Sequence, residues 1–132
     1  MICVDSSAIV AIVKGEPERD GFIEAFRRAE VAFLSDANFL ESAMICEGLA
    51  SIPGAALFDT ELAVLRELGL VTVAFDNIQA ELVREGFRRF GKGHHPAGLN
   101  FGDCFAYALA KALDAPLLFK GEDFAKTDVK RA

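Results

Sequence analysis

Short apolar runs alternate with longer segments of helical spacing along the whole of this 132-residue chain. Four of the runs have the length and composition of buried strands: residues 2–4, 31–34, 71–75 and 116–119. In the segments between them, apolar residues recur every three or four positions, which is the spacing of one helix face. Strands that alternate with helices form parallel sheets, because a parallel connection needs a long crossover. The pattern therefore predicts an α/β fold of three layers, with helices on both faces of a short parallel central sheet.

Glycines mark where several of the predicted helices end. The helices are expected at residues 6–14, 18–29, 35–47, 55–68, 77–90 and 102–113. Gly15, Gly48, Gly69 and Gly91 follow four of these segments, and glycine is common just beyond a helix end. Residues 120–127 are expected to form a loop or a short helical turn. Every strand is nearly all apolar, which agrees with a sheet covered by helices on both faces.

Length and composition restrict the chain to a compact architecture. A chain of this length is long enough for one domain and too short for two ordinary ones, so residues 1–132 are expected to form a single domain. Hydrophobic residues make up 52% of the chain and charged residues 26%, a balance that excludes a disordered protein.

The cysteines and the hydropathy pattern bear on cellular location. Cys3, Cys46 and Cys104 lie in apolar runs and indicate reduced thiols rather than a disulfide framework. No uncharged apolar run reaches the roughly 18 residues needed to span a bilayer, and the first residues do not have the pattern of a secretion signal. We therefore expect a cytoplasmic protein with no membrane association.

Four acidic residues from distant segments are expected at one edge of the sheet. Asp5 closes the first strand, and Glu41 lies about two turns into the helix after the second. Asp103 begins the helix that leads into the last strand, and Asp123 follows that strand by four residues. Ligands of open parallel sheets bind beyond the carboxyl ends of the strands. The four carboxylates are therefore candidates for one site.

Each of these acids also has a simpler interpretation. An Asp at a strand end or helix start is often a cap, and Glu41 taken alone would be a solvated helix residue. Carboxylates 4 Å apart, however, repel by roughly 4 kcal/mol per pair at an effective dielectric of about 20. A cluster of them therefore persists only with a shared cation or with raised pKa values. Oxygen ligands suit Mg²⁺ or Mn²⁺ rather than Zn²⁺, and such an ion can polarise a phosphodiester.

The charged residues are unevenly distributed. The net charge of −6 argues against a protein that coats nucleic acid with its whole surface, but allows a local basic stripe. Such a stripe lies just before the Asp103 helix, in Arg88, Arg89, Lys92 and His94 together with Arg84 and His95. These side chains either contact phosphates or form a solvated helix end that complements the helix dipole.

Four segments, in order and covering nearly the whole chain, resemble the PIN-domain ribonucleases, and within them the VapC-type toxins. They are Ile-Cys-Val-Asp-Ser-Ser-Ala at residues 2–8, Asn-Phe-Leu-Glu at 38–41, the stretch 99–110 with its Asn-Phe-Gly-Asp helix start, and 117–124. The resemblance implies a Mg²⁺-dependent endoribonuclease, with Mn²⁺ as an alternative ion, that acts as the toxin of a type II toxin–antitoxin pair. It leaves transfer, ribosomal and messenger RNA open as substrates.

The resemblance also assigns residues to roles. Asp5, Glu41 and Asp103 match the acids that hold the metal, and Asp123 matches a fourth catalytic acid. Many relatives carry that fourth acid two positions earlier, at the place of Gly121, so Glu122 is a rival to Asp123. Ser6 matches a small hydroxyl residue beside the site, where it would contact a carboxylate, a water or substrate. Asn100 is expected to cap the helix that presents Asp103.

Partners and competing functions follow from the same resemblance. It implies a cognate VapB-type antitoxin, and either a homodimer or a toxin–antitoxin hetero-oligomer. The main alternative is a catalytically inactive PIN-fold scaffold that only binds. A haloacid-dehalogenase-type phosphatase would need a second Asp two residues after Asp5, where this chain has Ser7.

Overall fold

The computed structural model describes residues 1–48 and 53–132. These residues form a four-stranded sheet of β1 (Ile2–Val4), β2 (Ala32–Ser35), β3 (Leu70–Val73) and β4 (Leu117–Leu118). The strand order is β3-β2-β1-β4, and every pairing is parallel. The predicted short parallel sheet is therefore confirmed. No helix in the described ranges is long and apolar enough to cross a membrane.

The described helices lie where the spacing predicts them, with ends shifted by one residue at most. They are α1 (Ser6–Lys14), α2 (Arg19–Ala29), α3 (Asp36–Glu47), α4 (Gly54–Glu67), α5 (Asn77–Phe90) and α6 (Phe101–Leu113). A single 3-10 turn, η1 (Phe124–Lys126), occupies the segment expected to be a loop or short turn. Gly15 ends α1 in the left-handed conformation, with φ of +67°. That conformation is easily reached by glycine, which explains the sharp stop.

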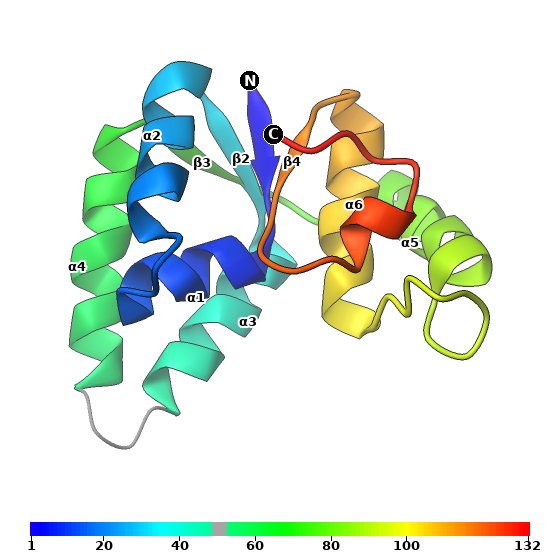
Figure 1. Ribbon diagram of the computed structural model, residues 1–132, viewed down its shortest axis with the longest axis horizontal. Coiled ribbons are helices and arrows are strands. Elements are labelled where there is room, and N and C mark those ends of the chain that lie inside the picture. Colours follow the sequence, from blue (N-terminus) through cyan, green and yellow to red (C-terminus); the bar gives the residue numbers. More distant parts are fainter. Residues whose placement is uncertain (49–52) are drawn as a thin grey trace.

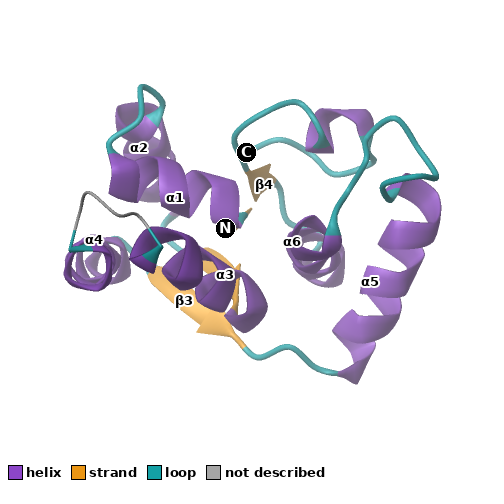
Figure 2. Ribbon diagram, turned by 90° about the horizontal axis from the view of Figure 1, so that it is seen from below, coloured by secondary structure: helices purple, strands orange, loops and turns teal. Residues whose placement is uncertain are grey.

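The helices cover the sheet in two layers (Figure 1). α1, α2, α3 and α4 lie on one side of the sheet, and α5 and α6 lie on the other. Seen from below, α4, α1 and α2 lie at the left, and α6 and α5 lie at the right (Figure 2). Each group encloses its own core: Ile12, Phe26 and Leu34 are fully buried in one, and Leu99 and Leu109 in the other. The three-layer α/β/α arrangement agrees with the expected fold.

The expectation that helices cover every strand on both faces is wrong for β3. Val71 is 46% exposed and Thr72 is also exposed, because β3 is an edge strand. The strand ends at Val73, two residues before the predicted end. Phe75 lies in the following loop, and its ring packs edge-on against Phe105 of α6 at 4.8 Å between centroids. Its apolar side chain therefore belongs to the contact with α6 rather than to the strand.

The strand order creates a switch point between β1 and β4. The chain builds the sheet outward from β1 to β2 and β3, and then returns past β1 to add β4 on the other side. In open parallel sheets, ligands bind beyond the carboxyl ends of the strands at such a point. Asp5 follows β1 there, and Lys120 follows β4 by two residues.

Candidate active site

Three of the four predicted acids border one hollow of about 370 Å³ at the carboxyl ends of β1 and β4. The polar and charged residues that line it are Asp5, Ser6, Ser7, Glu16, Glu41, Asn100, Asp103 and Lys120. The acids come from the starts of α1 and α6 and from the middle of α3. The fold therefore brings together carboxylates that are up to 98 positions apart in the chain, from Asp5 to Asp103.

Asp5 is the most buried of the acids. It is only 3% exposed and forms the N-cap of α1, where its Oδ2 accepts the Ser7 backbone N–H at 2.9 Å. Its own backbone N–H donates to the carbonyl of Leu118, so the end of β1 is held beside β4. The other carboxylate oxygen, Oδ1, is buried and has no hydrogen-bond partner in the protein. A buried oxygen of this kind costs free energy unless a ligand satisfies it.

Asp103 is held by a capping box at the start of α6. The Asn100 side chain accepts the Asp103 backbone N–H at 2.9 Å, and Oδ2 of Asp103 accepts the Asn100 backbone N–H at 3.0 Å. The predicted capping role of Asn100 is therefore confirmed. The box holds Oδ2 of Asp103 at the Asn100 backbone N–H and leaves Oδ1 for another partner.

Glu41 reaches the site because Gly102 has no side chain. The Glu41 carboxylate lies so close to Gly102 that a methyl group there would overlap both of its oxygens. The contact joins α3 to the first turn of α6, next to Asp103. A glycine at this position is required by the close approach of another side chain, since its backbone does not have a positive φ.

A buried amide joins the three acid-bearing helices. The Asn38 Nδ2 donates to the Ser6 hydroxyl and to the Gly102 carbonyl, each at 3.0 Å. Ser6 directly follows Asp5 in α1, Gly102 directly precedes Asp103 in α6, and Asn38 lies one turn before Glu41 in α3. Asn38 is completely buried, so these bonds are shielded from water.

Burial and mutual repulsion raise the pKa values of two of these acids. The pKa of Asp5 rises to about 7, mainly because the carboxyl is desolvated, and the charges of Asp103 and Glu41 add to the effect against the Ser7 hydrogen bonds. The pKa of Asp103 is also raised, first by burial and then by the charges of Asp123 and Glu41, while the bond from the Asn100 backbone opposes the shift. The acids therefore influence one another electrostatically.

The residues of the hollow fit a hard divalent ion. Their donors are carboxylate oxygens, the type that Mg²⁺ and Mn²⁺ prefer, and Oδ1 of Asp5 lacks a partner. Within residues 1–48 and 53–132, no three ligating side chains yet converge closely enough to enclose a metal. Glu41 rests against Gly102 instead.

The predicted fourth acid and the predicted hydroxyl residue form no hydrogen bond with the other acids. Asp123 is exposed beside η1 and does not line the hollow, although its charge acts on Asp103. Its rival Glu122 is also exposed and lines a different hollow, beside α2. The Ser6 hydroxyl donates to the Asn38 carbonyl at 3.3 Å and accepts from the Asn38 amide, so it is engaged in the buried join rather than with a carboxylate.

The basic stripe does not line the hollow. Arg89 pairs with Asp128 and Glu85 at 3.3 and 3.5 Å, and the His94 ring packs edge-on against Phe87. Arg88 and Lys92 are exposed on the last turn of α5 and just beyond it. His95 accepts the Ala97 backbone N–H and serves the loop. The predicted RNA contact of Arg88, Arg89, Lys92 and His94 stays a prediction.

Sequence reasoning missed several residues of the site. Ser7, rather than Ser6, contacts the Asp5 carboxylate, which is the side-chain bond of an N-cap to its second following residue. Asn38 entered the sequence analysis only as the first residue of the Asn-Phe-Leu-Glu segment, and Glu16 gave no signal beyond its polarity. Lys120 follows the last strand, where ligands of open parallel sheets bind, but the sequence prediction named only acidic residues there.

Comparison with known proteins identifies the class to which this fold and site belong. The family model described as "PIN domain" matches residues 2–130. The chain belongs to the PIN domain family.

Among its curated relatives, the chain is 44% identical over 126 residues to Ribonuclease VapC of Mycolicibacterium smegmatis, covering 96% of this chain and 95% of that protein. It is 43% identical over 126 residues to Ribonuclease VapC30 of Mycobacterium tuberculosis, covering 96% and 94%. The predicted resemblance to VapC-type proteins is confirmed.

Solved structures share the fold at much lower identity. VapC20 of Mycobacterium tuberculosis, described as a sarcin-ricin loop cleaving toxin, superposes with a TM-score of 0.77 at 14% identity, covering 100% of this chain and 98% of that one. VapBC2 of Rickettsia felis, solved with a promoter DNA fragment, gives a TM-score of 0.72 at 13% identity, covering 100% and 98%. These likenesses establish the three-layer fold.

Proposed function

We propose that this chain is a divalent-metal-dependent endoribonuclease and the toxin of a type II toxin–antitoxin pair. The observation that carries the proposal is the convergence of Asp5, Glu41 and Asp103 on one hollow, with a buried Asp5 oxygen that lacks a partner. The names of the relatives, VapC ribonucleases at 43 and 44% identity, support the activity.

Mg²⁺ is the proposed ion, with Mn²⁺ as an alternative, and Asp5, Glu41 and Asp103 are its proposed ligands. When bound, the ion supplies Lewis-acid polarisation of the phosphodiester and offsets the repulsion among the carboxylates. Asp5 presents Oδ1 while Ser7 holds Oδ2, and the capping box orients Asp103. The N-termini of α1 and α6 add their positive dipole ends, which favour a phosphate beside the acids. Asp123 is proposed as an outer fourth acid.

The proposed reaction is hydrolysis of an RNA phosphodiester by water, which leaves a 5′-phosphate and a 3′-hydroxyl. The test is incubation of the purified protein with end-labelled transfer, ribosomal and messenger RNA in Mg²⁺ or Mn²⁺, and then with excess EDTA. Cleavage that stops with EDTA and leaves 5′-phosphates is the expected result. A folded protein that cleaves none of the three RNA classes would favour the alternative, an inactive PIN-fold scaffold.

The proposed partner is a VapB-type antitoxin, which is supported by the VapBC2 complex among the structural neighbours. A homodimer or a toxin–antitoxin hetero-oligomer is part of the proposal, and the exposed Leu40, Met44 and Ile45 of α3 support an assembly that covers them. A single PIN domain over residues 1–132 is supported by the family match. A cytoplasmic location is supported by three buried, free cysteines.

A further inference from the structure

Lys120 lies at the switch point of the sheet, beside the proposed metal ligands. β1 and β4 are neighbours, with Val4 opposite Leu118, and the chain leaves their ends through Asp5 and Lys120. Of the lysines and arginines in the described ranges, Lys120 is the one that borders the hollow with the three acids. It therefore occupies the place where an open parallel sheet binds its ligand.

The backbone of Lys120 is fixed to the Asp5 cap through a single residue. The Lys120 N–H donates to the Ser7 hydroxyl at 3.0 Å, and the Ser7 N–H donates to the Asp5 carboxylate at 2.9 Å. Any motion of this loop would break a bond to the helix start that carries Asp5. The backbone of Lys120, from which the side chain extends, therefore has a fixed position relative to Asp5.

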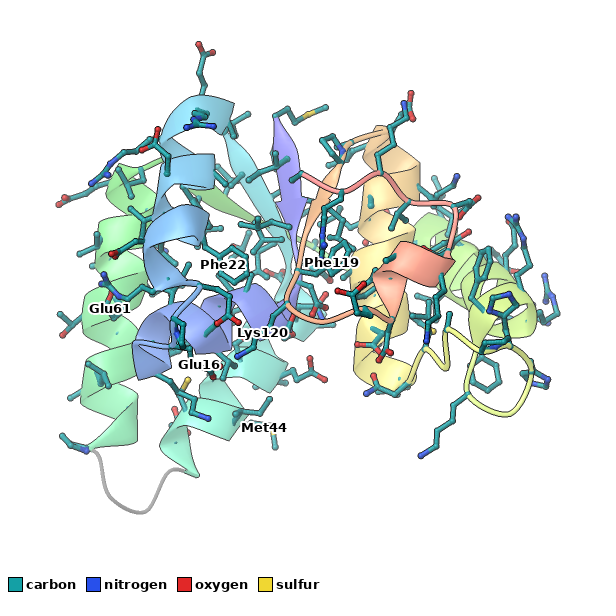
Figure 3. All side chains as sticks on the ribbon, viewed as in Figure 1. Glu16, Phe22, Met44, Glu61, Phe119 and Lys120 are labelled. Carbon is teal, nitrogen blue, oxygen red and sulfur yellow. The ribbon has the colours of Figure 1, made fainter. Side chains whose placement is uncertain are left out.

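The side chain, in contrast, is held by groups that can release it. The Lys120 ammonium pairs with Glu16 and, at 3.3 Å, with Glu18, and Figure 3 shows Lys120 beside Glu16 below α2. Both pairs are partly exposed to solvent, where ion pairs are weak. Glu16 has a second cation, Lys14, at 3.6 Å. Glu16 therefore keeps a partner when Lys120 moves to another anion.

RNA needs such a cation at this hollow. Four carboxylates, those of Asp5, Glu16, Glu41 and Asp103, line it, and they repel a phosphate backbone. The basic stripe that sequence reasoning offered for phosphate contact does not line it. Lys120 thus supplies a positively charged side chain next to the acids, in addition to the charge of any bound metal ion.

We propose that Lys120 is a substrate-binding residue, whose ammonium exchanges Glu16 and Glu18 for a phosphate of the RNA when substrate enters the hollow. The proposal rests on the ribonuclease function proposed above. The competing explanation is a structural one, in which the ion pairs of Lys120 only connect the β4 loop to the turn between α1 and α2.

The test compares Lys120→Gln, Lys120→Arg and the wild type for binding of a fluorescent RNA in EDTA, over a series of salt concentrations. Lys111→Gln is the matched control, because Lys111 also forms an exposed ion pair, at 3.0 Å to Asp128, but does not line the hollow. We expect Lys120→Gln to weaken RNA binding by about threefold to tenfold and to reduce the salt slope by about 0.7, the value of one phosphate contact on a single strand. Lys120→Arg and Lys111→Gln should resemble the wild type.

Two further readouts separate substrate binding from a structural connection. In Mg²⁺, Lys120→Gln should raise KM while kcat changes by about twofold at most, because the acids remain in place. Glu18→Gln should tighten RNA binding, because it removes a carboxylate that competes for Lys120. If Lys120→Gln has a lowered Tm but keeps the salt slope of the wild type, and the wild type still cleaves RNA, the substrate-binding role of Lys120 is wrong and the ribonuclease function stands. A wild type that neither binds nor cleaves RNA would overturn the ribonuclease function, and this assignment with it.

Discussion

At the scale of single residues, the site depends on one carboxyl group kept out of water. Asp5 ends a strand, caps a helix and still has a buried oxygen with no partner in the protein. A cap requires only one oxygen, which leaves the second oxygen available to the proposed metal ion. Its pKa of about 7 is the electrostatic consequence of the burial. A group in this state stabilises the metal-free fold when protonated and destabilises it when charged.

The first prediction concerns pH. The pKa of Asp5 is higher in the folded state, at about 7, than the ordinary value of 3.8, so the folded state binds the proton more tightly. The free energy of unfolding in EDTA should therefore fall as the pH rises from about 4 to about 7. Asp5→Asn cannot ionise and should be more stable than the wild type at pH 8 by roughly 1–3 kcal/mol, with a smaller difference at pH 5.

Urea unfolding of both proteins at the two pH values measures this difference. Asp20→Asn, which removes an exposed acid from the first turn of α2, is the control and should leave the pH dependence unchanged. If Asp5→Asn lost stability with pH as steeply as the wild type, Asp5 would not be the group that titrates.

The second prediction concerns Gly102. Gly102→Ala should push the Glu41 carboxylate out of its place, because the new methyl group would overlap it. The overlap is with the end of a flexible side chain, so the fold should survive while RNA cleavage falls by at least about tenfold. Gly21→Ala in α2 is the matched control, since nothing lies within 4 Å of the added methyl group. Full activity in a well-folded Gly102→Ala protein would show that Glu41 is not needed where it lies.

At the scale of helices and strands, the site is assembled by a buried join rather than by the acids themselves. Asn38 connects α1, α3 and α6 through two hydrogen bonds of 3.0 Å. A repulsive set of carboxylates needs such an independent attachment, because the acids contribute no attraction until a cation is present. The join's members Ser6 and Gly102 are the chain neighbours of Asp5 and Asp103, and Asn38 lies one turn before Glu41.

The third prediction follows from this join. Asn38→Ala leaves the Gly102 carbonyl and the Ser6 hydroxyl without their donor, and should lower stability by about 1–3 kcal/mol. It should also weaken Mn²⁺ binding, measured by calorimetry, because the three helices lose their spacing. Gln79→Ala removes one partly buried side-chain bond, of 2.9 Å to the Ala74 carbonyl, far from the acids in the chain. That control should lose stability but keep its Mn²⁺ affinity; equal losses of affinity would contradict the role of Asn38.

The elements themselves were largely predictable from the sequence, because their signals are local. Helical spacing and glycine stops located the helices of the described residues, and apolar runs located the strands. The edge position of β3 was not predictable, since it depends on which strands become neighbours. At the site, position along the strands indicated Asp5, and the cap pattern indicated Asn100. Asn38 and Lys120 were missed because their roles depend on contacts between segments far apart in the chain. Ser7 was missed although its bond to the Asp5 cap is local.

At the scale of the whole molecule, the fold gathers negative charge at one place, which the net charge alone does not reveal. The chain has a net charge of −6, but several of its carboxylates face one hollow and its basic stripe lies elsewhere. A divalent cation is the partner that this distribution favours most directly. Because the proposed ligands come from three separate segments, the unfolded chain lacks the proposed site, and an ion bound there would stabilise only the folded protein.

The fourth prediction is therefore a metal-dependent Tm. Mn²⁺ should raise the Tm of the wild type, by the equivalent of about 2.7 kcal/mol at one hundred times its Kd, and EDTA should reverse the change. Asp103→Asn should show little of this increase, because it replaces one proposed ligand. An equal increase in the variant would place the ion somewhere else on the protein.

The most direct test of the account is RNA cleavage by Asp5→Asn and Asp103→Asn beside the wild type. All three proteins are given the same end-labelled RNA at saturating Mg²⁺ or Mn²⁺, after circular dichroism has shown that they are folded. We expect the wild type to cleave and each substitution to lower the rate by at least about a hundredfold, because each removes a proposed ligand of the same ion. Cleavage that survives both substitutions would contradict this expectation and would require a different active site.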